Sequence, residues 1–325
     1  MAYSVRIVEK ARQALENAKA DKESQYLQNL QRAYIQVPRL KEIDSLLRRS
    51  MAAAAQAAFA KGSDAREMME QVKKANLSLQ QERETLLKEK FPACFLDESP
   101  VCDTCGGAGY VGSKMCDCLH KLCQQEQAKE LQQLTSGQES FANFRLDYYP
   151  DQPDPNIGVS PRKIMEANLK VCKTYAAGFT PDIGNLMFVG GTGLGKTFLS
   201  ACIANAVVDK GFSVAYESAP RLFSKLEKER FNPDEASHAD AENFRTCDLL
   251  IIDDLGTEMP GQFVTAALYN LLTERLTEHR AILVSTNLNA DEMARRYSPQ
   301  IASRLQGNFR RLTFVGQDIR VLQSK

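Results

Sequence analysis

A glycine-rich stretch near the middle of the chain has the composition and spacing of a phosphate-binding loop. It follows the pattern Gly, four residues, Gly, Lys and Thr, and consists of Gly190, Gly191, Thr192, Gly193, Leu194, Gly195, Lys196 and Thr197. Glycines let consecutive backbone N–H groups turn toward a phosphate at a helix N-terminus, where the helix dipole favours negative charge. Lys196 is expected to reach the β- and γ-phosphates of ATP, and the Thr197 hydroxyl to ligate Mg²⁺. We therefore expect these residues, together with Phe198, to bind the nucleotide.

Two carboxylates follow a continuous apolar stretch at residues 249–252. Such a stretch predicts a central parallel strand of an α/β sheet, and ligands of these sheets bind at the carboxyl ends of the strands. Asp253 is therefore expected beside the Mg²⁺ and Asp254 beside the attacking water. Asn287 follows another predicted buried strand at residues 281–285, and its amide is suited to orient that water. The alternative for Asn287 is a turn residue that precedes the next helix.

Four cysteines in two close pairs predict a zinc site. They are Cys102 with Cys105 and Cys116 with Cys118, and ten residues separate the pairs. At this spacing four thiolates can surround one Zn²⁺ tetrahedrally at about 2.3 Å, and the intervening glycines allow a tight turn beneath the metal. His120 or Cys123 could replace one of the later two ligands, and a redox dithiol is the alternative to a metal. Because no coordination position is left for a substrate, we expect a structural metal.

The charge of the chain limits which partners it can attract through a global field. Lys and Arg number 41 and Asp and Glu also number 41, so any contact with nucleic acid must be local. Arg221, Lys225 and Lys228 are candidates for such a contact, and a solvated charged face shared with neighbouring glutamates is the alternative. The chain has no run of 18 apolar residues, and its start is too charged for a signal peptide. These features predict a cytoplasmic protein without membrane contact.

Composition divides the chain into three expected domains. Residues 1–93 are expected to be helical, residues 94–134 to form the zinc-binding module with a connecting helix, and residues 135–325 to form the ATPase core. The first domain contains one Pro and one Gly before residue 90 and is rich in helix-forming residues. Pro38 is expected to interrupt its apolar stripes, and Gly62 to end a helix ahead of a capping box of Asp64 and Glu67. Such a region is either a self-contained helical bundle or a docking surface for another protein's helices, and the two are compatible.

Strands and helices alternate along the third domain, as in a parallel sheet flanked by helices. The expected strands are residues 185–189, 212–216, 249–254 and 281–285, and the expected helices are 161–177, 198–208, 220–230, 262–280 and 299–305. Phe141, Phe144 and Tyr148 precede these elements. They are expected either to pack onto the edge of the core or to cover the adenine of the nucleotide.

Residues 141–320 resemble the AAA+ ATPase of the DnaC/DnaI family of replicative helicase loaders, with the transposition helper IstB as a close relative. The motifs that carry the resemblance are the phosphate loop, the strand that ends in Asp253 and Asp254, the sequence Ser285-Thr286-Asn287, and the sequence Ser303-Arg304-Leu305. The resemblance implies an α/β fold of the AAA+ P-loop type, preceded by a zinc-binding module and an all-α N-terminal region. It also implies that Arg304 acts on the ATP of a neighbouring subunit and that Arg320 is the second sensor arginine. Asp254 departs from the pattern, because many members have Glu there.

The resemblance further implies the function of the protein. The chain is expected to be an ATPase that loads a DnaB-type hexameric replicative helicase onto single-stranded DNA when replication begins. Its partners would be that helicase, single-stranded DNA and other copies of the chain in an ATP-dependent oligomer, and its cofactors ATP, Mg²⁺ and Zn²⁺. The alternative is an IstB-like ATPase that assists a transposase, although such proteins generally lack a long helical and zinc-bearing front end.

Overall fold

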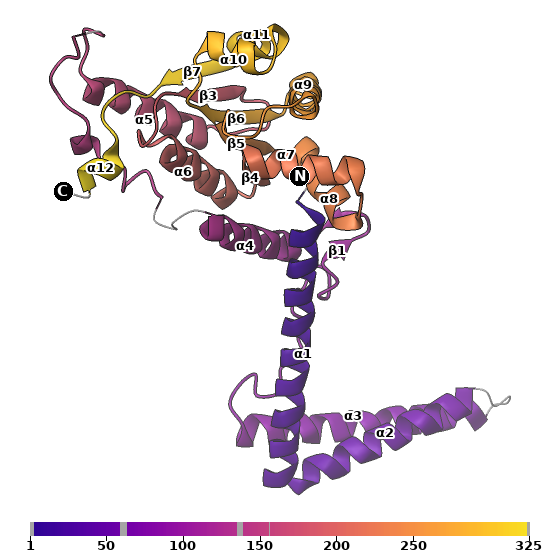
Figure 1. Cartoon of the computed structure of the whole chain (residues 1–325). Helices are drawn as coiled ribbons and strands as arrows, with labels where there is room; N and C mark the ends of the chain where they lie inside the picture. The colour runs from indigo at the N-terminus through magenta and orange to yellow at the C-terminus, as the bar shows by residue number, and fades with distance from the viewer. Residues whose placement is uncertain (1–2, 59–63, 135–138, 156, 324–325) are drawn as a thin grey trace. The chain divides into compact units, whose positions relative to one another are not determined.

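The computed structural model of the chain describes residues 3–58, 64–134, 139–155 and 157–323 (Figure 1). By contacts it forms two compact units, one consisting of Met1–Ala14 with Gly112–Lys325 and the other of Leu15–Val111. The domain boundaries expected near residues 93 and 134 stay a prediction. The helix end expected at Gly62 and the side chains of the expected capping box, Asp64 and Glu67, lie outside the described part of the structure.

A five-stranded parallel sheet forms the centre of the larger unit. Its strands lie in the order β4-β5-β6-β3-β7 and all pairs are parallel. The strands are β3 (Asn185–Val189), β4 (Val214–Ser218), β5 (Leu249–Leu255), β6 (Ala281–Thr286) and β7 (Phe309–Thr313). The first four strands were expected, although β4 begins two residues later than predicted. The strand β7 was not expected. The carboxyl ends of β3, β5 and β6 therefore meet at one edge of the sheet, as the motifs require.

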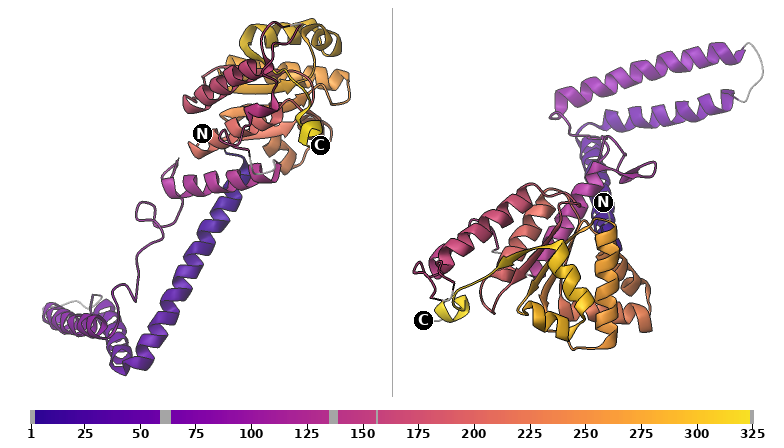
Figure 2. Two further views of the ribbon diagram at one scale, coloured as in Figure 1. Left: turned by 90° about the vertical axis from the view of Figure 1, so that its left-hand side faces the viewer. Right: turned by 90° about the horizontal axis from the view of Figure 1, so that it is seen from above.

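Helices cover both faces of this sheet (Figures 1 and 2). One set of alternate strand residues, among them Leu186 and Phe188, packs in one core with α5 (Pro161–Ala177) and α6 (Lys196–Asp209). The other set, among them Met187 and Val189, packs in a second core with α7 (Ala219–Phe231), α8 (Glu235–Thr246), α9 (Gln262–Thr277), α10 (Ala290–Arg296) and α11 (Pro299–Asn308). Because both faces are buried, the strands read as continuous apolar runs. The expected class, a parallel sheet flanked by helices, is confirmed.

The unit that contains the sheet also includes the first residues of the chain and a helix that precedes the ATPase core. Residues 3–14 include the first turns of α1 (Val5–Gln36), and the helix α4 (Asp117–Leu134) lies beside α6. The Tyr3 hydroxyl donates to the Gly211 carbonyl oxygen at 3.0 Å and lies 3.2 Å from His120 Nε2. Lys10 Nζ pairs with Glu130 Oε1 at 2.8 Å. The N-terminal residues are thus packed on the unit that contains the sheet, which the sequence did not indicate.

The smaller unit is helical. It contains most of α1 together with α2 (Pro38–Ala58) and α3 (Asp64–Lys90), and α2 and α3 lie side by side (Figure 2). The break expected at Pro38 is confirmed: α1 ends at Gln36, and Pro38 opens α2, where its missing N–H costs nothing. Ala33, Leu40 and Phe91 form a small core. Throughout the described residues of both units, no helix is long and apolar enough to cross a bilayer.

Candidate functional site

The phosphate loop connects β3 to α6 at the carboxyl edge of the sheet. Gly193 and Gly195 have φ angles of +70° and +86°, which residues with a side chain rarely adopt. A Cβ atom on Gly193 would lie 1.8 Å from Asp318 Oδ1, and one on Gly195 would lie 2.9 Å from the Tyr149 hydroxyl. The loop therefore needs glycine at both positions, and its backbone fits the cradle that a phosphate group requires.

Lys196, the first residue of α6, is buried and turned back into the loop. Its Nζ donates to the carbonyl oxygens of Gly190 and Gly191 at 2.8 and 2.6 Å, and to Asn287 Oδ1 at 2.6 Å. Burial lowers the pKa of Lys196, whereas Asp254 and Asp253 raise it. The structure thus brings Asn287, which follows β6, to the phosphate loop.

The two carboxylates of β5 lie in different surroundings. Asp253 is buried, its Oδ2 accepts a hydrogen bond from the Tyr216 hydroxyl at 3.0 Å, and its Oδ1 accepts one from Ser285 Oγ. Asp254 is half-buried and has a left-handed backbone with φ of +54°. The pKa of the Asp254 carboxyl is raised first by burial and then by Asp253, whereas Lys196 and Arg320 lower it. Both acids thus lie beside the phosphate loop, as expected from their position at the carboxyl end of β5.

A cavity of about 660 Å³ opens beside the loop. Its lining combines residues of the loop and of the start of α6 with Asp254, with the segment before α5, and with the end of the chain: Ala142, Asn143, Phe144, Arg145, Tyr148, Tyr149, Thr192, Gly193, Leu194, Gly195, Lys196, Thr197, Phe198, Asp254, Ile319 and Arg320. This volume lies within the range of small-molecule sites. Phe141, Phe144 and Tyr148 all pack against the core, and Phe144 and Tyr148 also line the cavity, so the structure agrees with both of their expected positions. The residues present fit a nucleoside triphosphate.

The chain segment after β7 runs along the phosphate loop. The Ile319 N–H donates to the Gly193 carbonyl oxygen at 3.0 Å, and Asp318 Oδ1 accepts from the Arg320 N–H at 2.9 Å. Arg320 is on the short helix α12 (Ile319–Gln323) and lines the cavity. The sequence alone does not predict that Arg320 lies at the cavity. The hydrogen bond between Ile319 and the phosphate loop brings it there.

Arg304 lies elsewhere in the unit, on α11, and the described lining of the cavity does not include it. Its Nη2 donates to the Tyr269 hydroxyl at 2.8 Å, and its guanidinium carbon lies 4.3 Å from the centre of the Tyr269 ring. Tyr269 therefore holds Arg304 by a hydrogen bond and a cation–π contact. The sequence does not single out Tyr269, because it lies on α9, far from Arg304 along the chain.

The four cysteines predicted as zinc ligands lie together. The Sγ atoms of Cys102, Cys105, Cys116 and Cys118 are all within 4.8 Å of one another. A tetrahedral site with Zn–S bonds of about 2.3 Å has sulfur atoms about 3.8 Å apart, so this arrangement is close to what zinc requires. The Gly109 N–H also donates to Cys105 Sγ at 3.2 Å, a bond that stabilises a thiolate. The donor set therefore fits Zn²⁺, and the structural role of the metal stays a prediction.

The two alternative zinc ligands have other surroundings. His120 Nε2 lies 3.2 Å from the Tyr3 hydroxyl, and burial raises the pKa of the Cys123 thiol to about 11. A buried thiol with a raised pKa is a poor thiolate donor. These observations favour the set with Cys116 and Cys118.

The basic residues considered for DNA contact on α7 have acidic neighbours. Lys225 Nζ pairs with Glu217 and lies 3.4 Å from Asp240 Oδ2, and Arg221 Nε lies 3.4 Å from Glu217 Oε2. Lys228 Nζ pairs with Asp234 Oδ2 at 2.7 Å. These contacts favour the alternative of a solvated face in which the charges compensate one another.

Parts of the chain are similar to known ATP-binding proteins. Residues 156–302 match the family model described as IstB-like ATP binding protein. The replicative helicase loader DnaC of Escherichia coli K12 is 23% identical over 138 residues, which are 42% of this chain and 56% of that protein. A putative insertion sequence ATP-binding protein of Sinorhizobium fredii is 33% identical over 104 residues, or 32% of this chain and 34% of that protein.

Among solved structures, a DnaC helicase loader crystal structure aligns with a TM-score of 0.44 and 19% identity, covering 54% of this chain and 98% of that one. The chain spans little more than half the length of the E. coli relative it matches. The matched region contains the phosphate loop, the two acids of β5 and Asn287. This part of the chain is therefore similar to IstB-like ATP-binding proteins and to the helicase loader DnaC.

Proposed function

We propose that this protein is an ATP-dependent loader of a DnaB-type hexameric replicative helicase onto single-stranded DNA. The observation that carries the proposal is the cavity beside the phosphate loop, where Lys196, Asp254 and Arg320 converge in a domain whose relatives include DnaC. The cytoplasm is the compartment in which such a protein works.

In this proposal each of the residues beside the phosphate loop has a separate role in ATP hydrolysis. Bound Mg²⁺ would neutralise charge on the phosphates, and Thr197 and Asp253 would hold it. Lys196 would exchange its present carbonyl partners for the β- and γ-phosphates. Asp254, whose raised pKa makes it a better proton acceptor than an ordinary carboxylate, would act on the attacking water, which Asn287 would orient. Arg320, which lines the same cavity, would contact the γ-phosphate.

Arg304 would serve a neighbouring copy of the chain. It lies outside the described lining of its own cavity and is held by Tyr269 near the surface of α11. A guanidinium that reaches the γ-phosphate of another subunit stabilises charge that develops in the transition state. Hydrolysis would therefore require an ATP-dependent homo-oligomer, which would also gather the weak DNA contacts of single subunits.

Residues 1–93 would bind the helicase. In the helical unit several large apolar side chains are exposed, among them Ile35 at 79%, Leu77 at 57% and Leu27 at 51%. Contiguous exposed apolar patches mark protein interaction sites, and these side chains are the candidates for such a patch in the helical unit. The zinc module would stabilise the segment between this region and the ATPase core.

The second candidate is an IstB-like helper of a transposase. The insertion-sequence relative from Sinorhizobium fredii, at 33% identity, favours it. The helical region and the cysteine cluster ahead of the ATPase core favour the helicase loader instead, because IstB-like helpers generally lack such a front end.

The test is to mix the full chain with the replicative helicase of its own cell and to weigh the complexes by native mass spectrometry, with and without ATP. We expect a complex that depends on ATP. The Lys196→Ala variant, which should not bind ATP, is the control. Binding to a transposase encoded nearby instead of to the helicase would support the second candidate. Binding to neither would refute both.

A further inference from the structure

The end of β5 is irregular where it carries the two acids. Ile252 pairs with Val284 and Leu255 pairs with Thr286, so two residues of β5 lie opposite the single residue Ser285 of β6. Asp254 has the left-handed φ of +54° that such a bulge accommodates. β-Bulges are found next to active sites, where they change the direction of a side chain. This bulge gives Asp253 and Asp254 their different surroundings.

Ser285 connects both acids. Its Oγ accepts a hydrogen bond from the Asp254 N–H at 2.9 Å and donates one to Asp253 Oδ1. The hydroxyl thus satisfies a backbone N–H that the bulge removes from the strand pairing, and it also fixes a carboxylate. Ser285 is fully buried, so water does not compete for these bonds.

Tyr216 holds the other oxygen of the same carboxylate. Tyr216 lies on β4 opposite Ile251 of β5, and both side chains belong to the same core. Asp253 follows Ile251 by two residues, so its side chain is on the same face of the sheet. The Tyr216 hydroxyl donates to Asp253 Oδ2 at 3.0 Å. Among the described residues each oxygen of Asp253 therefore has one donor, and a carboxylate with about four acceptor positions keeps others for a metal or its water ligands.

We propose that Tyr216 and Ser285 are positioning residues that fix the Asp253 carboxylate for binding Mg²⁺. This inference rests on the role that the proposed function gives to Asp253. Groups that hydrogen-bond a metal-binding carboxylate set its orientation and basicity, and their removal weakens metal affinity. Tyr216 and Ser285 do so from the two strands that flank β5.

The experiment measures how Mg²⁺ strengthens binding of a fluorescent ATP analogue to the full chain. For Tyr216→Phe and for Ser285→Ala we expect the half-saturating Mg²⁺ concentration to rise about 10–100-fold, as for other partners of metal ligands. The affinity measured without Mg²⁺ should stay unchanged, because neither residue belongs to the described lining of the nucleotide cavity. Ser285→Thr keeps the hydroxyl and should restore most of the Mg²⁺ response.

The chain offers matched controls. Ser213 Oγ donates to Asp248 Oδ2 at 2.8 Å and accepts from the Asp248 N–H at 3.0 Å, a similar buried serine–aspartate contact at the amino ends of β4 and β5. The Tyr175 hydroxyl is likewise bonded, to the Gly184 carbonyl oxygen at 2.9 Å. Ser213→Ala and Tyr175→Phe should leave the Mg²⁺ response unchanged. An equal shift in these controls would show a general loss of stability and overturn the inference.

Asp253→Asn separates failure of this inference from failure of the proposed function. If Asp253→Asn leaves the Mg²⁺ response unchanged, the role assigned to Asp253 is wrong. If Asp253→Asn shifts the response but Tyr216→Phe and Ser285→Ala do not, the positioning role is wrong and the proposed function stands. Should Ser285→Ala fail to fold, Tyr216→Phe, which removes one oxygen atom only, decides the question.

Discussion

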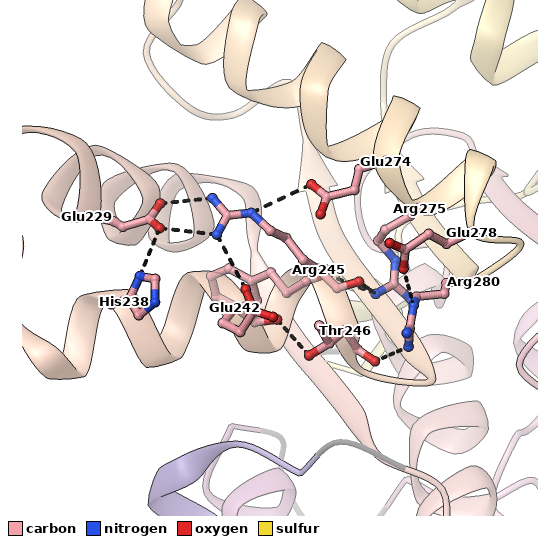
Figure 3. Close-up of polar contacts among 10 residues, drawn as sticks. Glu229, His238, Glu242, Arg245, Thr246, Glu274, Arg275, Glu278 and Arg280 are labelled. Atoms are coloured by element: carbon pink, nitrogen blue, oxygen red, sulfur yellow. Dashed lines mark hydrogen bonds and ion pairs between the residues drawn. The ribbon is translucent and has the colours of Figure 1, made fainter.

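Two arginines near the start of β5 and β6 allow a direct test of whether burial or the number of ion pairs determines stability (Figure 3). Arg245 on α8 pairs with the carboxylates of Glu229, Glu242 and Glu274. Arg275 on α9 is completely buried, and its guanidinium donates to the carbonyl oxygens of Phe244, Arg245 and Ala281 at 2.9, 3.1 and 2.7 Å. A count of ion pairs would make Arg245 the more important residue. Burial makes Arg275 the more important one.

The magnitudes follow from the surroundings. Replacing Arg275 by Ala removes the donor of three main-chain carbonyls, and an unsatisfied buried acceptor costs about 1–3 kcal/mol. Since relaxation recovers part of the cost of three unsatisfied carbonyls, we expect a loss of about 3–5 kcal/mol. The side chain of Arg245 is 28% exposed, and half-exposed ion pairs contribute about 0–1 kcal/mol each, so Arg245→Ala should cost roughly 1 kcal/mol.

Thermal unfolding of the full chain, followed by far-ultraviolet circular dichroism, measures both variants. For a unit of this size 1 kcal/mol corresponds to about 2–4 °C, so Arg275→Ala should lower the melting temperature by about 6–20 °C and Arg245→Ala by about 2–4 °C. Arg275→Lys should fall close to Arg275→Ala, because an ammonium cannot reach three carbonyls with the geometry of a guanidinium. Equal shifts for Arg275→Ala and Arg245→Ala, or a larger one for Arg245→Ala, would refute the reasoning from burial.

Three further predictions concern metal, catalysis and docking. Protein purified without chelator should contain one Zn²⁺ per chain by elemental analysis, and Cys102→Ser should lose the metal while ATP-analogue binding persists; metal-free wild-type protein would contradict the zinc site. Arg304→Ala should bind ATP normally but lose about 10³–10⁵ in steady-state turnover with helicase and single-stranded DNA present, and should recover activity when mixed with Lys196→Ala. No recovery despite co-assembly would show that Arg304 is a surface residue. Ile35→Asp combined with Leu77→Asp should abolish helicase binding in pull-down measurements without changing ATP affinity, and intact binding would place the docking surface elsewhere.

The buried strands could be predicted from the sequence because both of their faces are covered. Their apolar runs need no knowledge of the neighbouring elements, and the residue types at their ends identify the edge of the sheet that carries the site. β7 escaped prediction because Arg310 and Arg311 interrupt its sequence; as the edge strand it exposes both side chains. α8 escaped because it is polar and is defined mainly by a capping box between Asp234 and Ser237, a local signal that the apolar pattern does not contain.

The site could be predicted as far as the parallel strands determine it. The rule that ligands bind at carboxyl ends placed Asp253, Asp254 and Asn287 beside Lys196, and Lys196 does contact Asn287. The bulge at Asp254 could not be predicted, because one extra residue between strands leaves no trace in composition. The cation–π contact of Arg304 with Tyr269 depends on how α11 packs against α9, which only the folded chain determines.

The contacts of the N-terminal segment affect how helicase docking should be tested. β4 is an edge strand of the sheet, and an uncovered edge exposes unpaired backbone groups. Gln127 on α4 covers it in part, because its Nε2 donates to the Val214 carbonyl oxygen at 2.6 Å, and Tyr3 binds the turn that leads into β4 through Gly211. A truncated chain that begins after α4 would therefore lose the region proposed to bind the helicase and would also uncover β4. Since Tyr216 on β4 holds Asp253, such a truncation would also disturb the proposed Mg²⁺ site, and loss of helicase binding could not be assigned to docking alone. Substitutions of exposed side chains such as Ile35 leave β4 covered and separate the two effects.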